Sequence, residues 1–335
     1  MVASILLITK NYPPQIGWME KYAFDLHQNL LKNHQVFLLK SGPRRNFMYK
    51  SKILYVIYDF FRLLLFLFKV IIFGPYFSRK SDIIWSIDGS VWILGLYLKI
   101  FSKDSQTRVT IHGKDLSWSF PGYSFLLSFV LRKTDSIYLV SDFLKKNLIT
   151  KFPYISQRKL LVTAHSYSSL TFYPALPFEK DLFLKAYNIP SNKILLFSLG
   201  RFVPKKWFDW FLEEVLPYLS PRFHYVLWWF GPLESIIQQI VIQKKISNCT
   251  LLWPINDSQE KAKFFTSADY FIMSNISDAS DLEWFGLVLL EAQFYSKKII
   301  LSDADWLNER VPEGAIVLPS KNALSWIKAI NNLPY

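Results

Sequence analysis

The sequence predicts an α/β protein built from two Rossmann-like domains, each with a parallel sheet. The chain has 335 residues, which is too long for one ordinary core and fits two domains of roughly 150 residues each. Two continuous apolar runs of strand length, 4–10 and 193–199, each lead into a loop and a helix pattern, as doubly wound domains begin. Between them, the periodicity weakens and Pro174, Pro177 and Pro190 appear, which indicates a linker.

Composition restricts the class of protein and of partner. Hydrophobic residues make up 51% of the chain and charged residues 19%, which argues against disorder. The formal net charge of +13 favours an anionic partner: nucleic acid, an anionic membrane face or a phosphorylated small molecule. The single Cys249 excludes an internal disulfide framework and a Cys-based metal site, as expected in a reducing cytoplasm. Residues 1–8 lack a basic n-region and a cleavage site, so we expect a strand there and no secretion.

The longest apolar segment, 53–73, raises the question of membrane contact. Asp59, Arg62 and Lys69 are spaced through it, and each charge near the middle of a spanning helix costs about 2.5–3.5 kcal/mol on insertion scales. A membrane span is therefore disfavoured, and we expect a helix buried in the first domain. An interfacial helix is the alternative, because four basic residues come before the segment: Arg44, Arg45, Lys50 and Lys52.

In the first domain, polar residues follow the predicted strands at their carboxyl ends. Strands are expected at 4–10, 36–39, 83–87, 108–111 and 135–140. Doubly wound sheets bind ligands at the carboxyl ends of their strands, where loop 11–20 and His112 would lie. A His in this place can hydrogen-bond a substrate hydroxyl, although a lone His is more often structural. Ser141 is expected to cap the helix that follows the last of these strands.

In the second domain, two cations follow the first strand. Strands are expected at 193–199, 225–230, 270–273 and 298–301. Arg201 offers a fixed, always charged fork for phosphate oxygens, and Lys206 adds a movable point charge across a Pro turn. The pair suits a diphosphate, whereas the simpler interpretation is a basic surface loop.

A further stretch, 281–292, places two carboxylates around a turn and a helix start. Glu283 precedes the turn, and Glu291 follows the apolar run 287–290 that reads as the first turns of a helix. The unpaired N–H groups of a helix start favour an anion, and carboxylates beside them can accept hydrogen bonds from sugar or ribose hydroxyls. The combination suits a nucleotide sugar, although two Glu eight positions apart are a weak signal alone.

Four segments match motifs of one enzyme family: 17–20, 112–115, 200–209 and 283–291. They resemble, in order, the Gly-Gly-x-Glu loop, His-Gly-x-Asp, Gly-Arg…Lys-Gly-x-Asp and Glu-x7-Glu of the retaining GT-B glycosyltransferases of family 4, also called glycosyl transferases group 1. The resemblance covers nearly the whole chain and is strongest at 200–209 and 281–292.

This resemblance implies an α/β protein of the GT-B type, with two Rossmann-like domains whose parallel sheets face each other across a cleft. The implied domains are 1–165 for the acceptor, a linker at 166–192, and 193–335 for the nucleotide sugar. The implied activity is retaining transfer of a hexosyl group from a nucleotide-diphosphate sugar to a saccharide or lipid-linked acceptor. Neither a metal nor a cofactor is expected. Such an enzyme of polysaccharide biosynthesis would work in the cytoplasm or as a peripheral protein at the inner face of the membrane.

The resemblance also implies roles for individual residues. His112 and Glu283 would be catalytic, with contacts to the donor sugar. Arg201, Lys206 and Glu291 would bind the nucleotide, with Glu291 on the ribose. The loop around the donor sugar and phosphates would include Gly17, Phe285, Gly286 and Leu287.

Six tryptophans stand where the family has loop glycines: Trp18, Trp207, Trp229, Trp253, Trp284 and Trp306. The chain has 12 Trp and only 11 Gly, against about 23 Gly expected at average usage of about 7%. Because glycine permits positive φ and close backbone approach, six such losses are hard to reconcile with function. Our hypothesis is that the source organism reads UGA as Gly, so that these positions are glycines in the natural protein.

If the tryptophans are real, the chain is instead a catalytically inactive GT-B relative that binds sugar nucleotide or glycan. A nucleic-acid binder is a third class, which rests on the net charge of +13 and the aromatic content alone, since no motif of that class is present. The sequence does not identify the nucleotide, the sugar, the acceptor or the oligomeric state.

Overall fold

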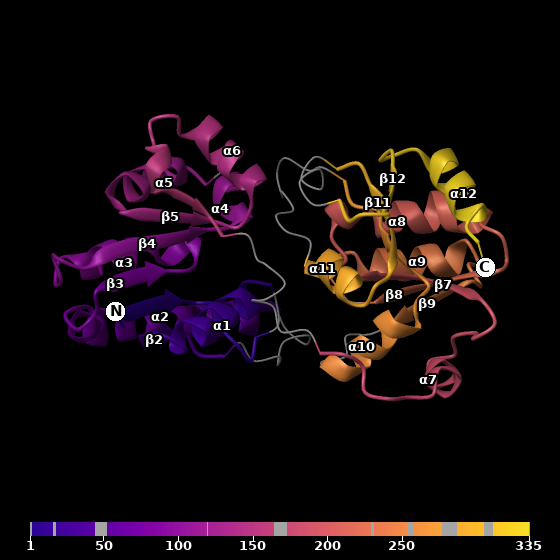
Figure 1. The fold of residues 1–335 in the computed structure, drawn as a ribbon, viewed down its shortest axis with the longest axis horizontal. Helices are drawn as coiled ribbons and strands as arrows, with labels where there is room; N and C mark the ends of the chain where they lie inside the picture. The colour runs from indigo at the N-terminus through magenta and orange to yellow at the C-terminus, as the bar shows by residue number, and fades with distance from the viewer. Residues whose placement is uncertain are drawn as a thin grey trace. The chain divides into compact units, whose positions relative to one another are not determined.

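The computed structural model of the protein describes residues 2–15, 18–43, 52–118, 120–163, 173–228, 231–252, 257–276, 287–304 and 311–334. The chain divides into two compact units, residues 1–171 and 172–335 (Figure 1). Each unit contains one six-stranded sheet with helices packed on it. The predicted α/β class with two parallel sheets is confirmed.

The sheet of the first unit has the strand order β2-β1-β3-β4-β5-β6. Its strands are β1 (Ser4–Thr9), β2 (Gln35–Lys40), β3 (Ile83–Ser86), β4 (Gln106–Ile111), β5 (Ser136–Leu139) and β6 (Leu160–Val162). All of these neighbours pair in parallel; Leu6, for example, lies between Phe37 and Ile84. The predicted strands at 4–10, 36–39, 83–87, 108–111 and 135–140 correspond to the first five, because continuous apolar runs suit strands that are covered on both faces.

The helices of the first unit are α1 (Trp18–Leu31), α2 (Lys52–Ser78), α3 (Trp92–Lys99), α4 (Gly113–Ser117), α5 (Tyr123–Lys133) and α6 (Asp142–Lys151). Helices α2 and α3 share one core with the sheet, in which Phe66 and Leu98 pack with Leu6 and Ile84. The Ser141 hydroxyl accepts a hydrogen bond from the Leu144 N–H at 3.2 Å, which confirms the predicted cap of α6.

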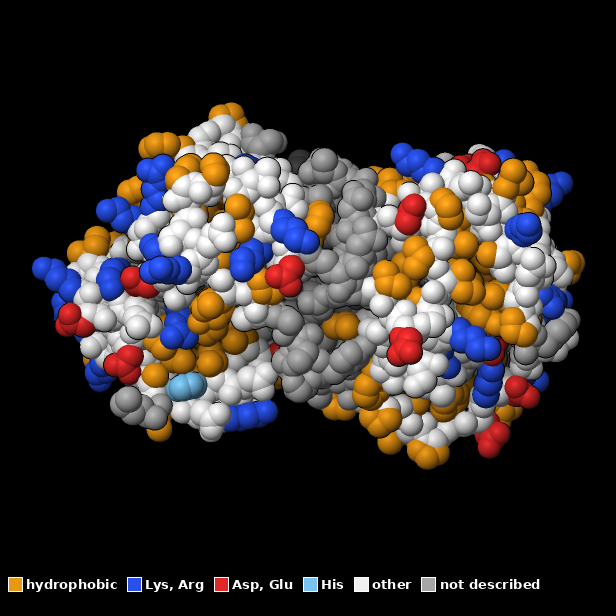
Figure 2. Space-filling view, turned by 45° about the horizontal axis from the view of Figure 1, so that its top comes forward, with side chains coloured by type: hydrophobic (Ala, Val, Ile, Leu, Met, Phe, Trp, Pro, Cys, Tyr) orange, Lys and Arg blue, Asp and Glu red, His pale blue; other side chains and the backbone are white. Residues whose placement is uncertain are grey.

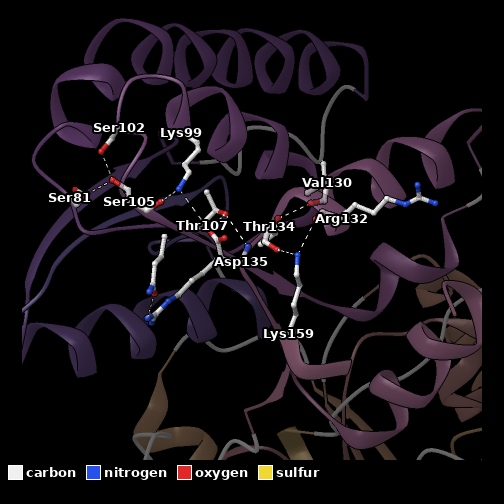
Figure 3. A network of polar contacts seen from close by, with 12 residues as sticks. Ser81, Lys99, Ser102, Ser105, Thr107, Val130, Arg132, Thr134, Asp135 and Lys159 are labelled. Carbon is white, nitrogen blue, oxygen red and sulfur yellow. Dashed lines mark hydrogen bonds and ion pairs between the residues drawn. The ribbon is translucent and has the colours of Figure 1, made fainter. Parts of the chain in front are cut away.

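A polar network joins the segments that enter the strands of this sheet (Figure 3). Asp135, directly before β5, accepts hydrogen bonds from the Thr107 N–H and hydroxyl at 2.8 Å each. The Lys159 ammonium donates to the carbonyls of Arg132 and Thr134, at 3.1 and 2.8 Å. These contacts satisfy backbone and side-chain groups at the amino edge of the sheet, opposite to the edge where ligands of such folds bind.

Helix α2 is buried on one side only, which corrects the expectation of a helix buried in the first unit. Phe66 and Val70 are 4% and 0% exposed, and the buried Arg62 is paired with Asp59 at 2.8 Å. The opposite side is apolar and exposed over the length of the helix: Val56, Phe60, Leu64, Leu65, Phe68, Ile72 and Tyr76. In the part of the chain that the structure describes, no helix is both long and apolar enough to cross a membrane. Apolar content revealed the helix but could not tell which of its sides packs.

The sheet of the second unit has the strand order β12-β11-β10-β7-β8-β9, again in parallel. Its strands are β7 (Ile194–Leu199), β8 (Phe223–Trp228), β9 (Cys249–Leu252), β10 (Tyr270–Met273), β11 (Lys298–Ser302) and β12 (Ile316–Leu318). Its helices are α7 (Lys180–Ala186), α8 (Phe208–Trp210), α9 (Glu234–Gln243), α10 (Ser258–Ser267), α11 (Leu287–Phe294) and α12 (Ala323–Asn331). Helix α7 lies within the range 166–192 that was predicted as a linker.

One element of the second unit departs from regular helix. The segment after α8 continues as a π-helical turn over 211–215 and a 3-10 turn over 216–218. Pro217 lies in that last turn and has no N–H to donate to a continuing helix. Trp326 of α12 is 0% exposed and packs against Trp210 and Phe211 of this segment, so the irregular helix is part of the core.

Candidate functional site

The first unit gathers polar side chains at the carboxyl ends of β1, β3 and β4. Asp88, which follows β3, is 0% exposed and accepts hydrogen bonds from the Thr9 hydroxyl and the Lys10 N–H, at 2.6 Å each. Its second oxygen accepts from the Asn11 side-chain amide at 2.9 Å. This carboxylate therefore fixes the start of the loop that follows β1, where the sequence predicts ligand contacts.

His112 lies directly after β4, as the sequence predicts, and is 3% exposed. Its Nε2 is 3.0 Å from the Ile87 carbonyl, and the Tyr22 ring packs edge-on at 5.1 Å. Because a carbonyl only accepts, Nε2 carries the proton. Burial lowers the pKa of His112, against the opposing effects of Asp88 and the Ile87 carbonyl, so the ring is neutral at pH 7. Its Nδ1 is then the nitrogen with an acceptor lone pair.

Asp115 completes this cluster. Its Oδ2 accepts a hydrogen bond from the backbone N–H of His112 at 2.8 Å. Burial raises the pKa of Asp115 to about 7, and Asp88 acts in the same direction, while the His112 N–H lowers it. A Cβ at position 89 would lie 1.9 Å from Asp115 Oδ1, so any larger residue there would displace this carboxylate. Sequence reasoning missed Asp88 and assigned no role to Asp115. The available signal was the place of both within a few residues of the carboxyl end of a strand, Asp88 after β3 and Asp115 after β4.

In the second unit, the loop after β7 presents the two predicted cations. Arg201 is exposed, whereas Lys206 is only 7% exposed. The Lys206 side chain runs close to Gly200, since a Cβ on Gly200 would lie 3.4 Å from Lys206 Cε. The Ser274 hydroxyl donates to the Lys206 carbonyl at 2.9 Å, and the Ile276 N–H donates to the Lys205 carbonyl at 2.9 Å. The β7 loop is thus tied to the segment after β10.

That segment leads into residues 277–286, which lie outside the described residues, as do Gly17, Glu283, Phe285 and Gly286. Helix α11 begins at Leu287, which agrees with the predicted helix start. Ser274 and Ile276 follow β10, the neighbour of β7 in the sheet. The structure therefore brings Arg201, Lys206 and the segment 274–276 to the same edge of the sheet.

Glu291 lies on α11 and is 6% exposed. Its carboxylate forms an ion pair with the Lys261 ammonium of α10. Lys261 was not expected from the sequence, since nothing in a single Lys on an amphipathic helix distinguishes it from surface. In the described ranges no group of three or more His, Cys, Asp or Glu side chains is placed to hold a metal ion.

The backbone conformation at Trp207 bears on the hypothesis that this position is a glycine in the natural protein. Its φ of 53° and ψ of 33° lie in the left-handed region, which costs a residue with a Cβ roughly 1–2 kcal/mol. Its indole stacks on Trp210 at 5.0 Å. The backbone at 207 therefore has the conformation that favours glycine. Trp229, Trp253, Trp284 and Trp306, together with the side chain of Trp18, lie outside the described part of the structure.

Comparison with known proteins adds a family and a fold. Residues 193–334 match the family model described as glycosyl transferases group 1. Among curated proteins, none matches this chain in sequence. Many solved structures match it in fold. Those named below align with most of this chain, and most of their own chain is aligned.

Anabaena HepE in complex with UDP-glucose has a TM-score of 0.71 at 11% identity, over 98% of this chain and 89% of that one. Sucrose-phosphate synthase from Thermosynechococcus elongatus has a TM-score of 0.71 at 17% identity, over 98% and 88%. The catalytic domain of starch synthase IV from Arabidopsis thaliana, bound to ADP and acarbose, has a TM-score of 0.69 at 14% identity, over 98% and 91%. The fold is GT-B.

Proposed function

We propose that this chain, a GT-B protein whose residues 193–334 belong to the glycosyl transferases group 1 family, moves a sugar from a nucleotide-diphosphate donor to an acceptor. The observation that carries this proposal is the loop after β7. It offers Arg201 and Lys206 at a strand end, and hydrogen bonds from the Ser274 hydroxyl and the Ile276 N–H tie it to the segment that precedes residues 277–286. HepE was solved with UDP-glucose, which supports a donor of this kind.

The proposed chemistry is retaining transfer without a metal or cofactor. As the bond between sugar and diphosphate breaks, negative charge develops on the leaving group, where Arg201, Lys206 and the N–H groups near Gly286 and Leu287 would stabilise it. Glu283 would hold hydroxyls of the donor sugar. Because the contacts of Arg201, Lys206 and the N–H groups strengthen as negative charge develops on the diphosphate, they would lower the barrier rather than merely tighten ground-state binding.

Glu291 would accept hydrogen bonds from the ribose. Its ion pair with Lys261 holds the carboxylate through Oε1 and leaves Oε2 as an acceptor. Gly17 and Phe285 belong to the proposed loop around the sugar and phosphates. His112, neutral at pH 7, would accept a hydrogen bond from a sugar hydroxyl through Nδ1.

The acceptor in this proposal is a saccharide or a lipid-linked saccharide, as in polysaccharide biosynthesis. The exposed apolar side of α2 supports peripheral contact with a membrane, since Phe60 and Leu65 are 61% and 62% exposed. Lys and Arg side chains lie among hydrophobic ones over the visible face of the first unit (Figure 2), which would favour an anionic leaflet. The proposed location is the cytoplasmic side of that membrane.

An inactive relative that binds sugar nucleotide or glycan remains the second candidate, and Trp207 bears on it. A bulky residue in the left-handed region favours a natural glycine at 207 and, with it, an unobstructed donor loop.

The experiment that separates the two candidates is a calorimetric donor screen on two preparations. One has the printed sequence, and the other has Gly at positions 18, 207, 229, 253, 284 and 306. If the chain is an active transferase, the glycine form should bind one nucleotide-diphosphate sugar and hydrolyse it slowly. Binding without any turnover would support the inactive relative. No binding of any donor by either form would reject both the transferase and a relative that binds sugar nucleotide.

A further inference from the structure

The first unit contains an apolar pocket of about 430 Å³ beside α5. Its walls come from the segment after β3, from α3, from Trp118 and from the segment 120–130. They include Trp92, Ile93, Trp118, Phe120, Leu126 and Val130. The volume is in the range of small-molecule sites, about 300–1,000 Å³. None of its described lining residues carries a charged side chain.

Tyr123 supplies the polar group of this pocket. The residue is 8% exposed, and its hydroxyl is buried without a hydrogen-bond partner among the described residues. Its ring packs on Trp118 at 4.8 Å between centroids. Burial and then the negative charge of Asp115 raise the pKa of Tyr123, so the hydroxyl stays protonated and available as a donor. A buried hydroxyl with no partner costs free energy, which a bound polar group would recover.

The pocket adjoins the His112 cluster. Gly89 lines the pocket and lies directly beside Asp115. A Cβ added to Gly89 would lie only 1.9 Å from Asp115 Oδ1. Asp115 in turn accepts the His112 N–H at 2.8 Å. A ligand with its apolar part against Leu126 and Val130 would therefore have its polar end close to Tyr123 and Asp115.

We propose that this pocket holds the hydrocarbon chain of an amphiphilic acceptor, with the Tyr123 hydroxyl hydrogen-bonded to the polar group at the head of that chain. The inference rests on the proposed function and specifies its acceptor as lipid-linked. A saccharide fits the walls less well, because its hydroxyls would be buried against aromatic and aliphatic groups with one donor to satisfy them. A hydrocarbon chain has no such requirement and gains about 0.8 kcal/mol for each buried methylene.

The test uses dodecanol that carries a photoreactive diazirine on its last carbon, with the hexanol analogue as the short-chain comparison. Dodecanol should bind at least tenfold more tightly than hexanol, and the cross-linked peptide should fall within 118–130. Leu126→Trp fills the pocket and should weaken binding at least tenfold. Phe125→Trp, at the neighbouring position that is 80% exposed and not part of the lining, should change it less than twofold.

Tyr123→Phe removes the hydroxyl and keeps the shape. It should weaken dodecanol binding about threefold to tenfold and leave binding of the dodecane analogue unchanged, with thermal stability equal or higher. Equal losses from the Leu126 and Phe125 variants, labelling elsewhere, or protection by maltose but not by dodecanol would overturn the proposal. UDP-glucose titrated into the same samples tests the proposed function separately. Binding of UDP-glucose without alkyl binding rejects only the pocket, and alkyl binding without UDP-glucose binding rejects only UDP-glucose as the donor.

Discussion

The ammonium of Lys261 on α10 forms an ion pair with the carboxylate of Glu291 on α11, and the carboxylate is 7% exposed. Breaking a buried pair from one side leaves an unpaired charge. Lys261→Met should therefore destabilise the fold, by about 1–3 kcal/mol because the lysine is 30% exposed and water screens the pair in part. Urea unfolding measures this change.

Glu291→Gln and the double variant complete a mutant cycle with Lys261→Met. The double variant should recover part of the loss, since no charge is then left unpaired. Donor KM should rise in both single variants if Glu291 holds the ribose. Additive stability losses would contradict the pair as an energetic unit, and an unchanged KM would remove Glu291 from the donor site.

Trp207 should be better replaced by glycine than by alanine. Both variants lose the stacking on Trp210, so their difference isolates the cost of a Cβ at a φ of 53°. Trp207→Gly should be more stable than Trp207→Ala by about 1–2 kcal/mol. Equal stabilities would show that the loop relaxes to a negative φ. Codons give an independent check: UGA at the six positions with UGG at Trp210 or Trp326 supports recoding, and UGG throughout contradicts it.

Asp115 should make stability depend on pH. Its pKa of about 7 in the folded protein lies above the ordinary value of about 3.9. The folded state therefore binds a proton more tightly between these pH values, and the free energy of unfolding falls as pH rises from about 4 to about 7. Asp115→Asn keeps an acceptor for the His112 N–H and should remove this fall, by more than about 1 kcal/mol, since one pKa unit is about 1.4 kcal/mol. Parallel stability curves for the two proteins would contradict a raised pKa.

The exposed side of α2 should bind anionic vesicles. Phe60→Ser with Phe68→Ser removes two side chains that are 61% and 59% exposed, and should weaken co-sedimentation with vesicles of phosphatidylcholine and phosphatidylglycerol at least tenfold. Phe24→Ser on α1, where the side chain is 39% exposed, is the matched control and should have little effect. Equal effects at both sites would indicate unspecific adsorption.

The sequence predicted most of the strands because their apolar runs are continuous, as at β1 and β7, and strand ends then located His112, Arg201 and Lys206. It did not predict contacts set by tertiary packing. The Thr9–Asp88 hydrogen bond joins positions 79 residues apart, and the Tyr123 pocket depends on how α5 lies beside Gly89. No local pattern carries such information. The side of α2 that packs was missed for the same reason, since both of its sides are apolar.

The most direct test of the central claim is a calorimetric titration of UDP-glucose into the glycine form and into its Arg201→Ala and Lys206→Ala variants. Loss of a charge-assisted contact costs about 1.5–3 kcal/mol, so each variant should bind at least tenfold more weakly. Lys193→Ala is the control, because Lys193 precedes the same strand and its ammonium donates to the Pro221 carbonyl at 2.7 Å. Its affinity should stay within twofold of the parent. Unchanged affinity in both the Arg201 and Lys206 variants, with thermal stability intact, would contradict a donor site at the end of β7.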